Sequence, residues 1–259
     1  MDKFDALFNF NIKILNALSM CVSVPRYFQY SSTVLSKNKN MIKYKSSDTL
    51  YVLGLGPSLR NVDLSILQDG DIICANRFYK FSNSDKCCPR FYCLMDNEYF
   101  VGNAVNDFLK AYQQFPETQF LLNGKYKKEI EKLIESKNNI FYVYGWSGML
   151  KKRSKIDFCR NLPVALNVVC RMIEAGIYMG YKKIILLGCD FNSFAMQQEK
   201  HCYDDKDDGV KWKLSYELFC YSFAAKEHEI LDHIAKNKNI TIFNATEGSL
   251  IDAYRRVSI

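Results

Sequence analysis

The chain has 259 residues, with 35 Lys and Arg against 28 Asp and Glu, a net charge of +7 and 48% apolar residues. This apolar content is enough to bury a core, which excludes wholesale disorder, collagen-like repeats and a coiled coil. Domains of the α/β class reach this length without splitting. We therefore expect one folded domain, residues 49–259, preceded by a basic segment, residues 1–48.

The first fifty residues hold six Lys and one Arg against three Asp, so +4 of the net charge lies there. The remainder is close to neutral, which argues against a nucleic-acid-binding body with a basic stripe. Apolar residues recur at helical spacing from Phe4 to Leu18 and predict an amphipathic helix. No apolar stretch is long enough to span a bilayer, and Asp2 and Asp5 do not suit a signal peptide, so we expect a cytoplasmic protein. The helix either packs on the body or makes peripheral membrane contact through residues 1–45.

The ten cysteines include no Cys-x-x-Cys pair and lie mostly in apolar runs. This usage is typical of small buried thiols in a reducing compartment, not of zinc ligands or a disulfide framework. We therefore expect no structural metal.

From residue 49 onward, short apolar runs alternate with longer segments of helical period. We expect strands at 49–56, 71–76, 90–95, 119–124, 140–145, 183–190 and 240–245, and helices at 99–114, 126–136, 162–180 and 215–237. The alternation predicts an α/β fold with a doubly wound, mostly parallel, Rossmann-like sheet that has helices on both faces. The polar stretch 192–213 directly follows a strand, which favours a lid or an acceptor-binding loop.

A glycine-rich turn, GLGPSL from Gly54 to Leu59, follows the first strand and opens a helix. Glycines let a backbone approach a phosphate closely, and the first N–H groups of a helix attract anions. Leu59 replaces the third glycine of the dinucleotide fingerprint, and the second strand ends in Asn76 instead of an acid, which disfavours an NAD enzyme. No P-loop motif is present. These features favour a nucleotide phosphate held by main chain and neutral amides.

The segments YVLGLGPSL, CANRFY and MGYKKIILLGCDF, in this order, resemble the bacterial sialyltransferases of the Campylobacter lipooligosaccharide type and the related Maf-type Rossmann proteins. The matches cover residues 50–100 and 162–194. The resemblance implies a sialyltransferase-like variant of the GT-A fold that binds a CMP-sugar. It assigns Gly54, Gly56, Ser58 and Asn76 to the donor, and we expect the neighbouring residues Leu55, Pro57 and Arg77 at the same nucleotide site.

The chain departs from that family at several positions. The family usually carries an asparagine where Leu55 stands, and a second asparagine after the third strand, where Asp96 or Asn97 would act instead. Asn167 stands near the family's Ser or Thr at the start of a long helix and can still donate to ribose or phosphate. Tyr203 is the nearest substitute for the family's phosphate-holding tyrosines. The family's catalytic histidine has no clear match.

An inverting glycosyl transfer needs a base for the acceptor hydroxyl. His201 lies in the polar loop and has Asp204 and Asp205 nearby to orient its ring, and histidine is the side chain best suited to proton transfer near neutral pH, so we expect it to be that base. Asp190 ends a buried strand, where it contacts the sugar or acceptor or else caps a turn.

The other two histidines, His228 and His233, lie on the predicted helix 215–237 beside charged residues, and we expect both to be exposed. The acidic run 204–208 either binds Mg²⁺ or is a solvated loop.

The leading hypothesis is a glycosyltransferase that moves a sialic-acid-like nonulosonate from a CMP-linked donor to a surface glycan such as lipopolysaccharide or capsule, with no required cofactor. Two alternatives remain open. One is a pyrophosphokinase that uses ATP and Mg²⁺ on a pterin alcohol, and the other is a non-catalytic nucleotide-binding protein. The sequence leaves open the donor sugar, the acceptor and whether the chain forms a homo-oligomer.

Overall fold

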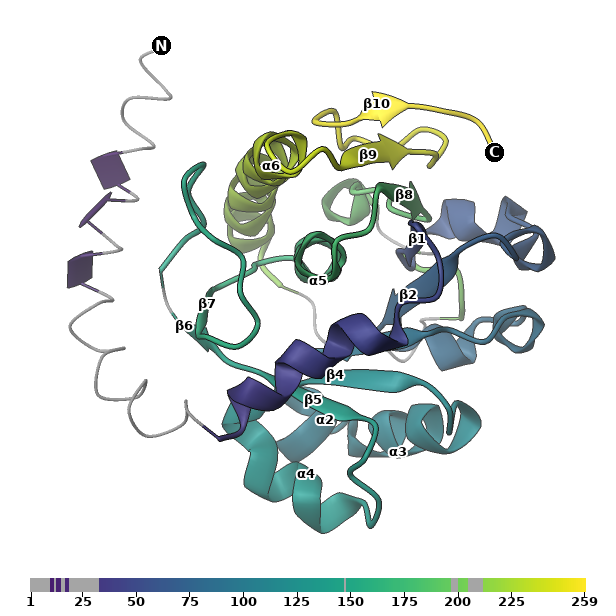
Figure 1. Ribbon diagram of the computed structural model, residues 1–259. Coiled ribbons are helices and arrows are strands. Elements are labelled where there is room, and N and C mark those ends of the chain that lie inside the picture. Colours follow the sequence, from purple (N-terminus) through teal and green to yellow (C-terminus); the bar gives the residue numbers. More distant parts are fainter. Residues whose placement is uncertain are drawn as a thin grey trace.

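The structure is a computed structural model that describes residues 10, 11, 13, 14, 17, 18, 33–146, 148–196, 200–204 and 212–259. Its main sheet has eight strands in the order β10-β9-β8-β1-β2-β3-β4-β5, and every neighbouring pair is parallel (Figure 1). The predicted doubly wound α/β fold is therefore confirmed, with a wholly parallel sheet in the described part of the chain.

All seven predicted strands are present, each a residue or more shorter than expected. They are β1 (Thr49–Leu53), β2 (Asp71–Ala75), β3 (Phe91–Leu94), β4 (Gln119–Asn123), β5 (Ile140–Val143), β8 (Lys183–Leu187) and β9 (Thr241–Asn244). The pattern did not predict β10 (Arg255–Arg256), β6 (Gly145–Trp146) or β7 (Leu162–Pro163), and the last two form a separate small sheet. Two-residue strands are too short to show a period.

The order of the strands reverses beside β1. Leu50 of β1 pairs with Asp71 of β2 on one side and with Ile184 of β8 on the other. The chain thus moves outward from β1 to β5 and then crosses back to continue through β8, β9 and β10. Such a switch point opens a crevice outside the carboxyl ends of the strands, where α/β proteins bind ligands.

Helices cover both faces of the sheet (Figure 1). The α-helices are α2 (Glu98–Val101), α3 (Val105–Gln114), α4 (Lys127–Leu133), α5 (Val168–Met179) and α6 (Leu214–Lys236). The 3-10 helices are η1 (Leu35–Tyr44), η2 (Pro57–Asn61), η3 (Leu64–Ile66), η4 (Phe78–Lys80), η5 (Ser84–Lys86), η6 (Gly124–Tyr126) and η7 (Ser193–Ala195). Side chains of η1, α5 and α6 share one apolar core with the sheet, and side chains of α2, α3 and α4 share the other.

Two helix predictions were wrong in their extent. The helix expected over 99–114 is divided into α2 and α3 at Gly102, whose extended backbone ends α2. The helix expected from residue 162 begins only at Val168, because Pro163 belongs to β7 and Asn167 caps the helix. The Asn167 Oδ1 accepts a 2.8 Å hydrogen bond from the Val169 N–H, as an N-cap residue does.

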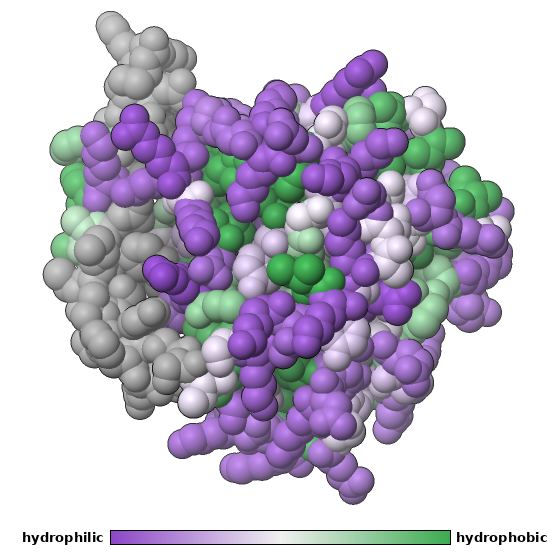
Figure 2. Space-filling model, in the orientation of Figure 1, coloured by the Kyte–Doolittle hydropathy of each residue, from purple (hydrophilic) through white to green (hydrophobic). Residues whose placement is uncertain are grey.

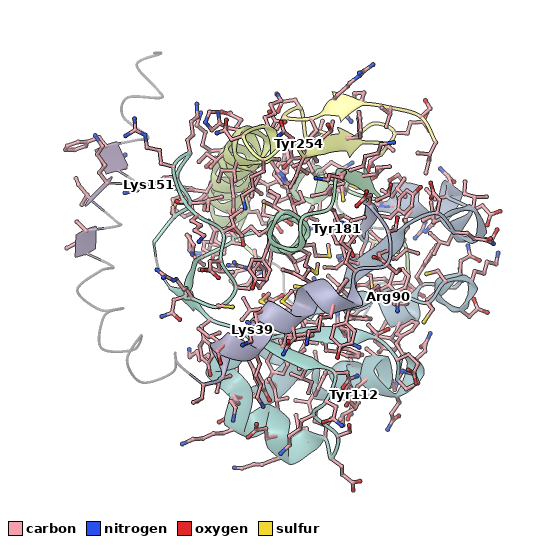
Figure 3. The ribbon with its side chains drawn as sticks, in the orientation of Figure 1. Lys39, Arg90, Tyr112, Lys151, Tyr181 and Tyr254 are labelled. Atoms are coloured by element: carbon pink, nitrogen blue, oxygen red, sulfur yellow. The ribbon has the colours of Figure 1, made fainter. Side chains whose placement is uncertain are left out.

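A buried carboxylate holds the amino edge of the sheet together. Asp71 accepts hydrogen bonds from the Ser46 hydroxyl (2.5 Å), from the main-chain N–H groups of Ser46 and Ser47 and from the Tyr181 hydroxyl (2.7 Å). Arg90 lies 3.3 Å away, and Figure 3 labels both Arg90 and Tyr181. Burial by itself would raise the pKa of Asp71, but these hydrogen bonds hold it below its usual value.

Part of the basic N-terminal segment packs on the body. Asn38 of η1 is buried, and its Nδ2 donates 2.8 Å hydrogen bonds to the carbonyls of Tyr142 and Phe158. Most of the predicted amphipathic helix, including Phe4, lies outside the described residues. Within the described part of the chain, no helix is both long and apolar enough to cross a membrane. The face shown in Figure 2 is largely hydrophilic, with hydrophobic residues visible in smaller areas between hydrophilic ones.

Candidate active site at the carboxyl edge of the sheet

A cavity of about 820 Å³ opens at the carboxyl ends of β1, β2, β3 and β8. The start of α5, residues 200–203 and the beginning of α6 complete its wall. This volume is in the range of small-molecule sites, and the position is the switch point of the sheet.

The cavity brings most of the predicted site residues together. Those on its wall are Gly54, Leu55, Gly56, Asn76, Arg77, Asp96, Asn97, Asn167, Asp190, His201 and Tyr203. Pro57, Ser58 and Asp204 do not line the cavity, and Asp205 lies outside the described residues. Eleven positions spread over 150 residues of sequence thus face one space, because most follow a strand or begin a helix at the same edge, and His201 and Tyr203 belong to the loop beside it.

The glycine turn is bonded to the end of β8. The N–H groups of Gly54 and Gly56 donate 2.8 Å hydrogen bonds to the carbonyls of Leu187 and Gly188, so neither N–H is available to a phosphate, contrary to the sequence-based expectation. The N–H of Leu55 has no hydrogen-bond partner among the described residues. It is the main-chain donor that this turn offers to the cavity.

Asp190 shapes the same turn. Its Oδ2 accepts a 2.7 Å hydrogen bond from the Ser58 hydroxyl, and its Oδ1 lies 3.3 Å from the Ser58 N–H. A Cβ atom on Gly56 would lie 1.9 Å from the Asp190 Oδ2, whereas the φ angle of Gly56, −67°, suits any residue. Gly56 is therefore required by the approach of Asp190, not by its backbone angle. Asp190 acts here as a turn cap, the second of the two roles expected for it.

Asn76 has the features of a ligand-binding residue. It adopts a left-handed conformation with φ 52° at the end of β2, and its Oδ1 is buried without a hydrogen-bond partner among the described residues. The main chain of Asn76 is held on both sides, because its N–H donates to Cys93 and its carbonyl accepts from the Tyr92 hydroxyl. A buried amide oxygen with no partner costs free energy that a ligand donor would recover.

Three further predicted residues lie on the same side of the cavity. Arg77 forms a 2.7 Å ion pair with Asp107, so its charge is shared with a protein carboxylate. Asp96 follows β3, and burial together with the charge of Glu98 raises its pKa above the usual value. Asn97 precedes α2 on the cavity wall.

Asn167 approaches the cavity from the start of α5. Its Oδ1 is used in the helix cap, so its Nδ2 group is the part that can donate to a ligand. The first N–H groups of α5 also add positive potential at this wall.

Part of the predicted lid is fixed on the body. The N–H of Cys202 donates a 2.8 Å hydrogen bond to the carbonyl of Leu55, and Arg60 donates to the carbonyls of His201 and Cys202. The rings of His201 and Tyr203 stack at 4.9 Å with an interplanar angle of 10°. The main chain of residues 201–202 thus holds the imidazole on the cavity wall, beside the glycine turn.

The prediction that His228 is exposed was wrong. The same prediction for His233 is confirmed. His228 is buried, its Nδ1 shares a 2.9 Å hydrogen bond with the Tyr254 hydroxyl, and burial lowers its pKa to about 3 (Figure 3 labels Tyr254). Charged neighbours in the sequence suggested a solvated helix face. The C-terminal segment covers that face, which the helical period alone does not reveal.

Sequence reasoning also missed a buried charged group behind the cavity. Arg171 and Glu174 of α5 form an ion pair, Arg171 donates a 2.6 Å hydrogen bond to the Pro163 carbonyl, and Glu227 of α6 is buried close by. Burial raises the pKa of Glu174 to about 7 and that of Glu227 to about 8, the latter also through the charge of Glu174. The available signal was an Arg and a Glu three residues apart on an otherwise apolar helix.

An aromatic wall was missed as well. Phe191, the first residue after Asp190, has φ 60°, and its ring lies 4.5 Å from that of Tyr221. Trp212 and Tyr216 also line the cavity, together with the charged side chains of Lys200 and Glu217. Periodic aromatic residues in LSYELFCYSF signalled a helix, but not which of its residues would face the site.

No group of three or more His, Cys, Asp or Glu side chains in the described part of the chain is arranged to hold a metal ion. Five of the nine described cysteines are buried, namely Cys74, Cys93, Cys170, Cys189 and Cys202, and Cys88 is exposed. The expectation of buried thiols therefore holds for about half of them.

Solved structures share this fold. The chain resembles the sialyltransferase CstII from Campylobacter jejuni in complex with cytidine-5'-monophosphate, with a TM-score of 0.51 and 18% identity over 82% of this chain and 85% of that one. A second CstII structure in complex with CMP has a TM-score of 0.50 and 17% identity over 80% of this chain and 84% of that one. The MAf glycosyltransferase from Magnetospirillum magneticum AMB-1 has a TM-score of 0.52 and 14% identity over 86% of this chain, which spans 38% of that protein. These likenesses confirm the resemblance in fold.

No curated protein matches the chain. The family model described as 6-hydroxymethylpterin diphosphokinase MptE-like matches residues 26–194, which is more than half of the sequence and includes the glycine turn, Asn76 and Asp190. The chain therefore belongs to the 6-hydroxymethylpterin diphosphokinase MptE-like family, on a fold shared with CstII and MAf.

Proposed function

We propose that this protein is a glycosyltransferase that takes a sugar from a CMP-activated donor, with a sialic-acid-like nonulosonate favoured, and transfers it to a glycan acceptor with inversion. The observation that carries the proposal is the unpartnered, buried Oδ1 of Asn76 on the wall of a large cavity at the switch point of the sheet. CstII is in complex with CMP in the two solved structures with this fold, which supports the choice of nucleotide.

The donor would occupy the half of the cavity next to β1, β2 and β3. In this arrangement the N–H of Leu55 and the Nδ2 of Asn167 donate to phosphate or ribose oxygens. The Asn76 Oδ1 accepts a hydrogen bond from a nucleoside hydroxyl or amino group. Neutral donors then carry most of the recognition, because the charge of Arg77 is shared with Asp107.

The transfer step needs few protein groups. The oxygen of an acceptor hydroxyl attacks the anomeric carbon of the donor sugar, the bond from that carbon to the phosphate oxygen breaks, and CMP leaves with the electron pair. The hydroxyl proton passes to the imidazole of His201, which lies on the cavity wall and is fixed by Arg60 through its carbonyl. The bond from Asp190 to Ser58 gives Asp190 a shaping role in this scheme.

A diphosphokinase is the second candidate, and the family model favours it. The charged side chains on the wall support it too: among the described residues, Asp96, Glu98, Asp190 and Glu217 face the cavity with two formal cations, Arg77 and Lys200. Mg²⁺ is commonly held by one or two carboxylates together with substrate phosphates, and Asp96 on the cavity wall would supply such a carboxylate. Such a site would neutralise the phosphates of ATP, and the protein groups would orient the pterin hydroxyl.

Peripheral membrane contact through residues 1–45 remains part of the proposal. Three described apolar residues of this segment, Phe10, Ile14 and Leu18, are exposed at helical spacing, and Lys13 lies between them. An exposed apolar stripe beside cationic groups suits an anionic membrane interface. Binding of the full chain to anionic vesicles at low salt, and its loss on removal of residues 1–32, tests this point.

A thermal-shift panel of CMP, CDP, UDP, GDP and ATP, each with and without Mg²⁺, separates the two enzymes. A ligand present at a hundred times its Kd adds about 2.7 kcal/mol to stability. The proposed function predicts stabilisation by CMP without a metal. Stabilisation by ATP only when Mg²⁺ is present would replace it with the diphosphokinase, and no response to any nucleotide would contradict both.

A further inference from the structure

Two exposed aromatic side chains face the cavity, Trp212 just before α6 and Tyr216 in its first turn. Trp212 and Tyr216 both line it, their ring centroids are 4.8 Å apart, and they are 57% and 48% exposed. Neither belongs to an apolar core cluster. Large apolar groups held in water at a cavity wall favour a ligand that covers them.

The two rings are separate from the donor half. Asn76 and Asp96 follow β2 and β3 on one side of β1, whereas α6 packs against α5 and against β9 on the other side (Figure 1). Asn76, Asp96 and the two aromatic side chains nevertheless line the same cavity. A second substrate bound at the rings would therefore lie beside the donor, with His201 on the shared wall.

A pair of charges stands next to the rings. The Lys200 Nζ lies 3.6 Å from the Glu217 Oε1, and both side chains line the cavity. At this separation the pair is loose, so the ammonium can donate to a ligand oxygen and the carboxylate can accept from a ligand hydroxyl. The wall thus offers an apolar aromatic surface with a hydroxyl-binding edge.

We propose that Trp212 and Tyr216 form a stacking platform for a pyranose ring of the acceptor glycan, with Lys200 and Glu217 binding its hydroxyls. A pyranose has a face of C–H groups that packs on aromatic rings and an edge of hydroxyls that needs polar partners, which matches both parts of this wall. The assignment rests on the proposed glycosyl transfer, since it names the substrate that receives the sugar.

The full chain is titrated with methyl β-galactoside, methyl β-glucoside and methyl β-N-acetylglucosaminide in the presence of CMP. Binding is followed by saturation-transfer NMR and by the fluorescence of the two tryptophans. The proposal predicts that at least one glycoside binds through its ring C–H groups. Trp212→Ala and Tyr216→Ala should each weaken that binding at least tenfold and leave CMP affinity unchanged.

Phe219→Ala is the matched control. Phe219 lies on the same helix and is 53% exposed, but it does not line the cavity, so its removal should leave glycoside binding unchanged. Equal weakening by all three variants would overturn the platform and indicate a general apolar contact. The platform would also be overturned if Trp212→Ala reduced binding to anionic vesicles but left glycoside binding unchanged.

The test separates this inference from the proposed function. If CMP binds but no glycoside in the panel binds, or if Trp212→Ala and Tyr216→Ala keep full glycoside affinity, the platform alone is wrong. If CMP does not bind the unaltered protein, the proposed glycosyl transfer fails whatever the glycosides do.

Discussion

The carboxylate of Asp190 accepts a 2.7 Å hydrogen bond from the hydroxyl of Ser58, across the point where the strand order reverses. Asp190 comes after β8 and Ser58 belongs to η2 after β1, so the bond joins two segments 132 residues apart. The glycine turn between them is therefore held by side chains as well as by the sheet.

Replacement of Gly56 should break the hydrogen bond between Asp190 and Ser58. In Gly56→Ala the new Cβ would lie 1.9 Å from the Asp190 Oδ2 and 2.5 Å from its Cγ, so the carboxylate must turn away and lose its bond to Ser58. We expect a cost of about 1–3 kcal/mol in stability and at least a tenfold loss of nucleotide affinity. Chemical denaturation and calorimetric titration measure the two effects.

Gly145→Ala is the control for that variant, because the nearest atom to its Cβ is an Arg171 nitrogen at 3.9 Å. It should keep nucleotide affinity. Combining Gly56→Ala with Asp190→Ala removes the two closest contacts and should recover part of the lost stability. Full nucleotide affinity in Gly56→Ala would show that the turn does not contact the ligand.

Asn76→Gly removes the amide but keeps the left-handed backbone, which glycine adopts without strain. We expect nucleotide affinity to fall about tenfold or more, while thermal stability changes little. Asn239→Gly is matched to it, since Asn239 also has a positive φ but is exposed and does not line the cavity. The assignment of Asn76 is wrong if both variants bind nucleotide as the unaltered protein does.

His201→Ala should lower kcat by about 10² to 10⁴ and leave CMP affinity nearly unchanged, because a general base assists the transition state. The measurement is release of CMP from a CMP-sugar at saturating acceptor. His233→Ala, on the exposed side of α6, should keep full turnover. Full turnover in His201→Ala would place the base elsewhere.

His228 should make stability depend on pH. Burial lowers its pKa from 6.5 to about 3, so below pH 6.5 the unfolded chain binds a proton that the folded protein does not. Stability is then full above pH 6.5 and falls towards pH 3 by about 1.4 kcal/mol per unit from this group. The free energy of unfolding, measured by chemical denaturation at pH 7, 6 and 5, should fall less steeply with decreasing pH in His228→Gln than in the unaltered protein. His233→Gln should show the same pH dependence as the unaltered protein. Identical slopes in all three proteins would refute the assignment.

The sheet and the part of the candidate site at the strand ends were predictable because both depend on local sequence. Apolar runs bounded by turn residues marked the seven strands, and parallel strands bring their carboxyl ends, with Gly54, Asn76 and Asp190, to one edge. The use of each polar group was not predictable, because it depends on partners distant in sequence. The N–H groups of Gly54 and Gly56, for example, donate to the carbonyls of Leu187 and Gly188, which lie far away in the sequence.

The α6 side of the site depended on packing between segments. His228 is buried in contact with Tyr254 from the C-terminal segment, whereas Trp212 and Tyr216 are exposed. A helical period identifies a helix but does not say what covers each face. For the same reason the sequence could not divide the cavity into the proposed donor and acceptor halves.

The central claim is that the cavity binds a CMP-linked donor, and isothermal titration of the full chain with CMP, and separately with ATP, with and without Mg²⁺, tests it most directly. The account predicts that CMP binds without a metal and that Asn76→Gly weakens this binding at least tenfold. Binding of ATP with Mg²⁺ but not of CMP would contradict the account and assign the cavity to diphosphate transfer.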